Sequence, residues 1–270
     1  MFLEFTKMNG AGNDFILIDD RMGALHLTTE QIVRLCDRNR GIGADGLILL
    51  KACRSGKADW AWDFYNSDGS TGEMCGNGAR CFARFLQSRT ATAGGSATFE
   101  TGAGVITAQF HGELVAVNLT DPKDLRIGDS VRLSTGVETI HSINTGVPHA
   151  VIYGAQFARG TVLETGAEVR RHPHFGPRGT NVNFVEVTGP NEIRVRTFER
   201  GVEGETLACG TGVTASALIS ACVHGFTSPV RVLVLGGDVL EVSFGGSGGR
   251  FDSVKLTGPA DFVFTGRVEI

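Results

Sequence analysis

The sequence lacks several features that would place the protein at a membrane or on nucleic acid. No apolar run approaches the ~20 residues that a membrane-spanning helix requires, so we expect no membrane partner. No lysine/arginine cluster is present and the formal net charge is −4, which argues against nucleic acid. The first residues, MFLEFTKMNG, contain no cationic segment followed by an apolar one. We therefore expect no signal peptide and a cytoplasmic protein.

Patterns for metal and nucleotide binding are also missing. The sequence has no Cys-x-x-Cys pair, so a zinc site is not expected. Gly41–Gly46 (GIGADG) lacks the Gly-Lys-Ser/Thr ending of a phosphate-binding loop, so nucleotide binding is not expected either. His172 and His174 have no acidic residue or cysteine beside them in the sequence and are interpreted as solvated loop residues. The six cysteines are expected to be reduced thiols.

The chain is long enough for one large or two medium domains, and it is unusually rich in glycine. It has 270 residues, of which 38 are glycine, about double the usual ~7% share. So much glycine suits many tight turns and favours a sheet over a helix bundle. The polar segment Thr120–Asp124 (TDPKD) is the expected boundary between residues 1–119 and 120–258, and residues 259–270 are expected to complete the first domain.

One stretch carries the chemistry. Asp59–Tyr65 reads as a strand, and the polar turn that follows leads to Cys75, then Gly-Asn-Gly, then a helix expected near Ala79. Two glycines in a first helical turn cost about 1 kcal/mol each, which a chain accepts where the backbone must approach something closely. The free N–H groups of a helix start bind anions, and the same field favours a thiolate. The stretch predicts a reactive cysteine beside a carboxylate site.

The pattern occurs twice, nearly half a chain length apart. Leu207–Gly212 reads LACGTG and is followed by the predicted helix Val213–His224. Two further matches, Phe64-Tyr65-Asn66 with Phe198-Glu199-Arg200 and Asn13-Asp14-Phe15 with Pro148-His149-Ala150, fall at about the same offset. Three matches in one register favour an internal duplication.

Most of the remaining chain reads as strands. Thr28–Arg38 is predicted as an amphipathic helix capped by Thr28, and Glu164–Arg170 as a short helix. The strands predicted by apolar alternation and turn residues are Phe2–Lys7, Phe15–Asp19, Leu47–Lys51, Asp59–Tyr65, Ala97–Thr101, Val105–Phe110, Leu114–Leu119, Glu138–Ile143, His149–Tyr153, Val182–Val187, Glu192–Phe198, Val230–Leu235 and Val239–Phe244, with Pro259–Ile270 also strand-like.

The helix after the second cysteine defines the fold class. Val213–His224 has no acidic, lysine or arginine side chain, and a helix that is apolar on all sides is buried on all sides. A sheet must wrap it, which predicts α+β domains built as a sheet around a central helix. Cys36, Cys81 and Cys222 are expected to pack in cores.

Two thiols on opposite faces of one carbon can invert it. A thiolate removes the α-proton of an amino acid, and a thiol returns a proton from the other side. The two helix starts stabilise the carboxylate as it becomes enediolate-like. The pair needs no metal and no pyridoxal lysine, so no cofactor is expected.

The motifs that carry this pattern resemble those of the diaminopimelate epimerase family, over essentially the whole chain. They are KMNGAGNDF, GIGADG, NSDGSTGEMCGNGARC and FERGVEGETLACGTG. The resemblance implies a pyridoxal-independent isomerase that converts LL-diaminopimelate to the meso form, for lysine and cell-wall synthesis. It also implies a homodimer. The fold it implies is two similar domains, each a mostly antiparallel sheet around a central helix, with the active site in the cleft between them.

The resemblance also assigns roles to residues. Cys75 and Cys209 match the acid–base pair, and His149 and Glu199 match the polar neighbours of the thiols. Gly76, Asn77, Gly210 and Thr211 match the amides that bind the reacting carboxylate. The positions that match the rest of the substrate site are Asn13, Asn66, Asn181, Glu199 and Arg200. From the residues alone, Asn13 and Asn66 are equally compatible with turn roles, and His149 with capping a loop.

Two positions depart from the family pattern. Val147 stands where many relatives have asparagine, in Gly146-Val147-Pro148-His149, and Gly46 stands where some have glutamine. Both changes concern contacts with the substrate rather than the chemistry.

Two alternative functions use the same cysteines. A proline- or hydroxyproline-type racemase shares the two-cysteine logic but closes over a small ring, without an asparagine/arginine set for a remote amino-acid end. A thiol redox or metal-binding protein is the alternative from a different class.

Overall fold

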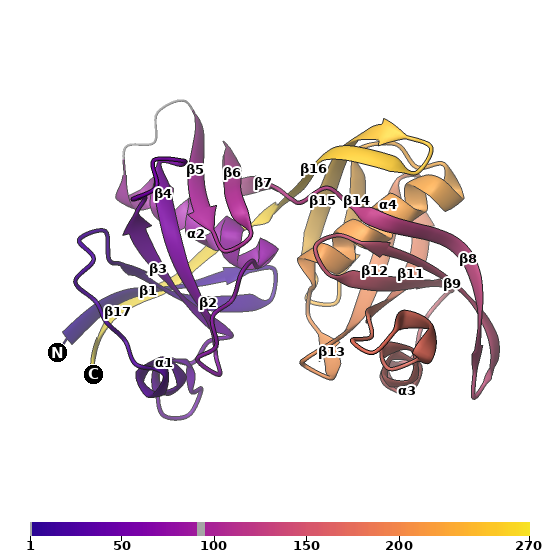
Figure 1. The fold of residues 1–270 in the computed structure, drawn as a ribbon, viewed down its shortest axis with the longest axis horizontal. Helices are drawn as coiled ribbons and strands as arrows, with labels where there is room; N and C mark the ends of the chain where they lie inside the picture. Colours follow the sequence, from indigo (N-terminus) through magenta and orange to yellow (C-terminus); the bar gives the residue numbers. More distant parts are fainter. Residues whose placement is uncertain (1, 91–94) are drawn as a thin grey trace. The chain divides into compact units, whose positions relative to one another are not determined.

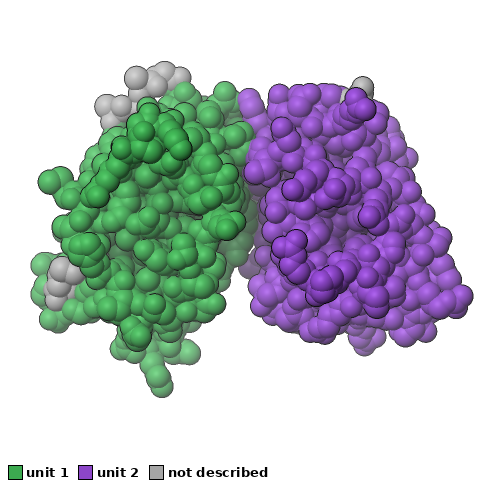
Figure 2. Space-filling model, viewed as in Figure 1, with its two compact units in different colours: residues 1–118, 258–270 green, residues 119–257 purple. Residues whose placement is uncertain are grey.

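The structure is a computed structural model that describes residues 2–90 and 95–270. It divides into two compact units, Met1–Asn118 with Gly258–Ile270, and Leu119–Thr257 (Figure 2). Each unit is α+β, with a long helix packed against the strands of that unit (Figure 1). The expected fold class is therefore confirmed.

Among the described residues, the first unit contains eight strands and two α-helices. The strands are β1 (Phe2–Gly10), β2 (Asn13–Asp19), β3 (Gly46–Ala52), β4 (Trp60–Asn66), β5 (Ser96–Thr101), β6 (Gly104–His111), β7 (Leu114–Asn118) and β17 (Asp261–Glu269), and the helices are α1 (Thr29–Cys36) and α2 (Gly76–Arg89). β17 pairs antiparallel with β1.

The second unit contains the other named elements. Its strands are β8 (Lys123–Leu133), β9 (Gly136–Asn144), β10 (Pro148–Tyr153), β11 (Asn181–Gly189), β12 (Glu192–Glu199), β13 (Gly204–Thr206), β14 (Val230–Val234), β15 (Val239–Ser247) and most of β16 (Arg250–Pro259), and its helices are α3 (Arg159–Arg170), α4 (Gly210–His224) and a 3₁₀ turn (Pro173–Phe175).

The two units repeat one topology. In the first, β1 to β4 pair in the order antiparallel, parallel, antiparallel, and β4 then pairs parallel with β5. In the second, β9 to β12 pair in the same order, and β12 pairs parallel with β14. In each unit the shorter helix follows the second of these strands, and the longer helix precedes the parallel return strand. The repeat expected from the sequence is confirmed at the level of topology.

The long helices are buried for different reasons. α2 packs aromatic side chains against its sheet, with Phe82 in contact with Trp62 and Phe99. α4 is built of small residues and is buried all round from Val213 to Ser220, as its composition predicts. The prediction is wrong for the last turn, because Cys222, Val223 and His224 are exposed there and the helix ends at Gly225, which is in the left-handed conformation.

Two thiols are core residues, as expected. Cys36 and Cys81 are buried, and burial raises their pKa values to about 11 and about 12. Both side chains therefore stay protonated and act as small apolar groups.

The sequence interpretation missed strands with weak alternation. β8 is largely exposed and shifts register twice along its pairing with β9, so it has no regular apolar period. The predicted loop Met8–Asp14 is instead a hairpin that continues β1 and β2, with Ala11 and Gly12 both at positive φ. α3 starts at Arg159, five residues before the predicted start.

The histidine-bearing loop is exposed at His174, as expected, but it has an acidic neighbour that the sequence did not predict. His174 Nε2 lies 2.8 Å from a carboxylate oxygen of Asp129, and His172 Nε2 lies 3.2 Å from the Arg132 carbonyl oxygen. The acidic partner comes from β8, far away in the sequence. Within residues 2–90 and 95–270, no three acidic, histidine or cysteine side chains gather as a metal site would require. In the same described residues, none of the helices combines the length and apolar character of a membrane span.

Candidate active site

The first helix start is built around Cys75. The structure begins α2 at Gly76, not near Ala79, so Cys75 is its N-cap, with extended backbone angles (φ −143°, ψ 117°). The backbone N–H of Gly78 donates to Cys75 Sγ at 3.4 Å. Gly76, Asn77 and Gly78 therefore form the first turn, whose N–H groups have no partner within the helix.

Glycine lets a hairpin approach this helix start closely. A Cβ on Gly10 would lie 2.7 Å from the Asn77 carbonyl oxygen and 2.9 Å from Cys81 Sγ. The end of β1 therefore packs directly on the first turn of α2, and the hairpin places Asn13 beside Asn77.

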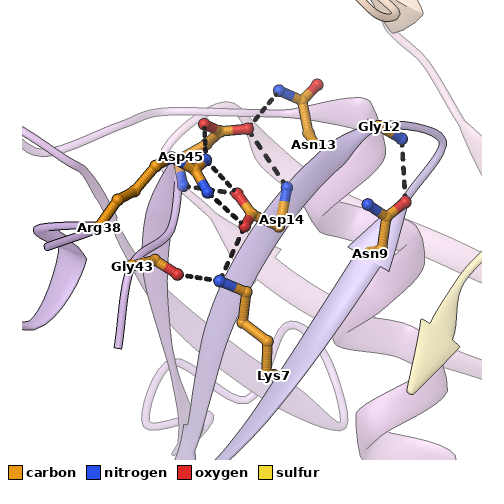
Figure 3. A network of polar contacts seen from close by, with 8 residues as sticks. All are labelled: Lys7, Asn9, Gly12, Asn13, Asp14, Arg38, Gly43 and Asp45. Carbon is orange, nitrogen blue, oxygen red and sulfur yellow. Dashed lines mark hydrogen bonds and ion pairs between the residues drawn. The ribbon is translucent and has the colours of Figure 1, made fainter. Parts of the chain in front are cut away.

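The side chains of Asn13 and Asn77 form a directed pair. Asn77 Nδ2 donates to Asn13 Oδ1 at 2.6 Å, and Asn13 Nδ2 donates to an Asp45 carboxylate oxygen at 2.9 Å (Figure 3). Because a carboxylate only accepts, Asp45 fixes which end of the Asn13 amide faces it. Asn77 is 2% exposed, and its Oδ1 has no hydrogen-bond partner among the described residues.

Charged groups hold Asp45 in place. Arg38 bridges two carboxylates, because its Nη2 lies 2.7 Å from Asp14 Oδ1 and 2.8 Å from Asp45 Oδ1 (Figure 3). Lys7 Nζ lies 2.8 Å from Asp14 Oδ2. Burial raises the pKa of Asp14, but hydrogen bonds and charge from Arg38 and Lys7 outweigh it and lower that pKa to about 2. The Asp14 carboxylate is thus ionised at neutral pH.

The second helix start has the same backbone design. Cys209 is the N-cap of α4, with φ −126° and ψ 107°, and Gly210 is the first helical residue. Cys209 is 8% exposed, and its Sγ lies 3.5 Å from the hydroxyl oxygen of Thr211. Thr145 secures the same turn, because its hydroxyl donates to the Thr211 carbonyl oxygen at 2.9 Å.

His149 lies directly behind Thr211. Its Nε2 is 2.9 Å from the Thr211 hydroxyl oxygen, and its Nδ1 is 3.1 Å from Asn183 Nδ2. The ring is completely buried, and burial, with a smaller contribution from the positive charge of Arg200, lowers its pKa to about 3. His149 is therefore a neutral imidazole at physiological pH.

Asn181 and Arg200 lie together at the ends of neighbouring strands. The Arg200 backbone N–H donates to Asn181 Oδ1 at 2.8 Å, and Asn181 Nδ2 donates to the Pro148 carbonyl oxygen at 3.3 Å. Glu199 is the last residue of β12 and pairs with Gly204 of β13. The parallel pairing of β10 with β11 places His149 opposite Asn181.

Asn66 ends β4 and also forms a turn. Its backbone N–H bonds to the Ser70 carbonyl oxygen, and its Nδ2 donates to the Ser70 hydroxyl at 3.0 Å. Asn66 pairs with Gly46 of β3, where a Cβ would lie 2.7 Å from the Tyr65 carbonyl oxygen. There is therefore no room for a side chain at Gly46.

Within each unit, the structure brings several predicted site residues together. The first unit gathers Cys75, Gly76, Asn77 and Asn13, and the second gathers His149, Cys209, Gly210 and Thr211 with Asn181 and Arg200 near His149.

Three polar residues of this surrounding network were not singled out from the sequence. They are Asp45, Asn183 and Thr197. For Asn183 a signal was present, namely an amide in the middle of the apolar run Val182–Val185.

Comparisons with known proteins identify the family. The family model described as diaminopimelate epimerase matches residues 5–124 and 141–263. A diaminopimelate epimerase of Chlorobaculum tepidum is 44% identical, over 97% of this chain and 100% of that protein. One from Aquifex aeolicus is also 44% identical, over 98% of each chain.

Solved structures share the fold at low identity. A phenazine biosynthesis protein of the PhzF family from Bacillus anthracis gives a TM-score of 0.76 at 15% identity, with 100% of both chains covered. A hydroxyproline epimerase from Agrobacterium vitis gives 0.72 at 16% identity, over 99% of this chain and 92% of that one. These likenesses concern the fold alone. The family model and the full-length relatives, together with the two cysteine-capped helix starts, show that the chain is an enzyme of the diaminopimelate epimerase family, a family of isomerases.

Proposed function

We propose that this enzyme interconverts LL- and meso-diaminopimelate in the cytoplasm by two-base proton transfer at the α-carbon, using two thiols and no cofactor. The observation that carries the proposal is the matched pair of helix starts. Each has a cysteine as N-cap in extended conformation, followed by Gly-Asn-Gly in α2 and Gly-Thr-Gly in α4. Membership of the diaminopimelate epimerase family supports diaminopimelate as the substrate.

Each step uses a group of this chain. One cysteine, as thiolate, takes the α-proton, and the other, as thiol, delivers a proton to the opposite face. Which cysteine starts depends on the configuration of the substrate. The first-turn N–H groups of both helices hold the α-carboxylate and stabilise the negative charge that develops on it.

The remaining predicted residues would hold the rest of the substrate. Arg200 suits the distal carboxylate, since a guanidinium binds a carboxylate through two parallel hydrogen bonds. Asn13, Asn66 and Asn181 would bind the polar groups of the distal end, while Glu199 would neighbour the reacting centre. His149 would act through Thr211, whose hydroxyl oxygen lies 2.9 Å from its Nε2.

We further propose a homodimer. β17 carries apolar side chains that are about half exposed: Phe262 at 47%, Val263 at 56% and Phe264 at 48%. A strand with this much exposed apolar surface favours pairing with a second copy. Sedimentation of the purified protein tests this, since a monomer at micromolar concentration contradicts it.

The reaction is tested by incubating the enzyme with LL-diaminopimelate, and separately with L-proline, in D₂O. We expect deuterium at the α-carbon of diaminopimelate only, together with the meso product. Cys222→Ala is a matched control, because this exposed thiol lies on α4 far from the N-cap and its loss leaves turnover unchanged. Exchange into proline instead of diaminopimelate, or turnover lost on treatment with a chelator, contradicts the proposal.

A further inference from the structure

The orientation of the Asn183 amide is fixed by its neighbours. Asn183 lies in β11 and is completely buried. Its Nδ2 donates to the Ala150 carbonyl oxygen at 3.0 Å, and its Oδ1 accepts from the Thr197 hydroxyl at 3.0 Å. A carbonyl oxygen only accepts, so the nitrogen of the amide must face Ala150. The opposite orientation would set two acceptors against each other.

This orientation in turn fixes the tautomer of His149. The second N–H of Asn183 Nδ2 points at His149 Nδ1, 3.1 Å away. An N–H needs an acceptor, so Nδ1 carries no proton and the neutral ring is protonated at Nε2. An imidazolium would place two donors face to face in a buried site. The burial and the Arg200 charge that lower the pKa of His149 act in the same direction.

The tautomer sets the direction of the next two contacts. His149 Nε2–H donates to the Thr211 hydroxyl oxygen at 2.9 Å. The hydroxyl hydrogen then points away from the ring, and Cys209 Sγ lies 3.5 Å from the same oxygen. A hydrogen bond donated to a sulfur stabilises the thiolate more than the thiol.

We propose that Asn183 is a positioning residue that fixes the Nε2–H tautomer of His149, and so turns the Thr211 hydroxyl into a donor toward Cys209. A side-chain donor then helps to hold Cys209 as a thiolate. The inference deepens the proposed function, because it rests on Cys209 being one of the two proton-transferring groups.

The tautomer is measured directly by nitrogen-15 NMR of the histidine side chains, with His149 assigned through its backbone. We expect a neutral ring protonated at Nε2, unchanged from pH 8 to pH 5. A ring protonated at Nδ1, or a ring that titrates to imidazolium in this range, overturns the proposal. This measurement needs no substrate and no variant.

The donor is tested through the reactivity of Cys209. The alkylation rate of the Cys209 peptide by iodoacetamide, followed by mass spectrometry against pH, gives the pKa of its thiol. We expect Thr211→Val to raise that pKa by about one unit, as the loss of a hydrogen bond to a charged group implies. Thr211→Ser keeps the hydroxyl and retains the original value.

A matched control lies on the same helix. Thr214 is also buried, but its hydroxyl donates to the Gly210 carbonyl oxygen, so Thr214→Val keeps the Cys209 pKa. Equal shifts in Thr211→Val and Thr214→Val, or no shift in either, overturn the proposal. If the tautomer and the shift are found in a protein that does not act on diaminopimelate, the proposed reaction is wrong and the positioning role stands.

Discussion

At the start of α2, the polar groups behind the helix are charged and partly open to solvent, whereas at the start of α4 they are neutral and buried. The side chains of Arg38 and Asp45 are 58% and 39% exposed. His149 and Asn183 are both 0% exposed. Two helix starts with the same N-cap residue and nearly the same backbone thus rest on different electrostatics.

The difference indicates how each start responds to its surroundings. Exposed ion pairs weaken with salt, whereas hydrogen bonds between buried neutral groups are screened much less. The buried network instead depends on every member being satisfied, because an unpaired polar group in the interior is costly. The two repeats therefore share the backbone geometry of the helix start, while the polar groups that hold it differ.

The largest expected effect concerns what the two starts share. Cys75→Ala and Cys209→Ala each remove one proton-transferring group and should lower the epimerisation rate by at least about 10² to 10⁴-fold. Circular dichroism should show that both variants keep their fold. Near-normal turnover in either variant would break the equivalence of the two starts and contradict the mechanism.

The next prediction compares the third residue of each helix. A Cβ on Gly212 would collide with Asn183 Oδ1, whereas one on Gly78 would meet only side-chain atoms of Ile48 and Phe15, at 3.3 and 3.4 Å. Gly212→Ala should displace the buried amide and lower the free energy of unfolding by about 2 kcal/mol. Gly78→Ala should change it by less than about 1 kcal/mol, since alanine favours the helix. Urea unfolding of both variants measures these changes. Equal losses of unfolding free energy would show that the two helix starts are not held by different neighbours.

The third prediction tests the charged support through the substrate. Asp45→Asn replaces the carboxylate that fixes the Asn13 amide with a group that both donates and accepts. We expect KM for diaminopimelate to rise about tenfold with kcat little changed. A tenfold change corresponds to the free energy of one hydrogen bond to a charged group. A loss confined to kcat would show that Asn13 does not act in binding.

The smallest effect is the dependence of stability on pH. The pKa of Asp14 is about 2 in the folded protein, below its usual value of 3.8. A lowered carboxyl pKa stabilises the fold above the unfolded value, and this contribution is lost as the pH falls from about 4 to about 2. With solvent screening, we expect about 1 kcal/mol from this group.

Urea midpoints measured across that pH window test this contribution. Asp14→Asn should flatten the profile, and 1 M NaCl should shrink the difference between wild type and variant. His149→Gln should instead flatten the profile between about pH 6.5 and pH 3, because the unfolded imidazole takes up a proton in this range while the folded one does not. A slope that survives in Asp14→Asn would assign the acid sensitivity to other carboxylates.

The sequence alone determined the features that depend on neighbouring residues. Thr28 and Gln31 form the predicted capping box of α1, since each bonds a backbone N–H three positions away. The buried helix in the second unit followed from its lack of charged side chains. The strands with regular apolar alternation were found because period and burial coincide, as in Trp60–Asn66. The cysteine-capped helix starts were visible in the Gly-x-Gly spacing.

Only the tertiary structure decided which distant residues share a hydrogen bond. Asp45 fixes Asn13 across 32 positions, and Asn183 meets His149 across 34, because parallel pairing aligns β2 with β3 and β10 with β11. Cys222 was misplaced because the composition of a helix does not reveal at which residue its burial ends. Local sequence encodes caps and periodicity, but strand register sets the direction of a hydrogen-bond chain, and register depends on the whole sheet.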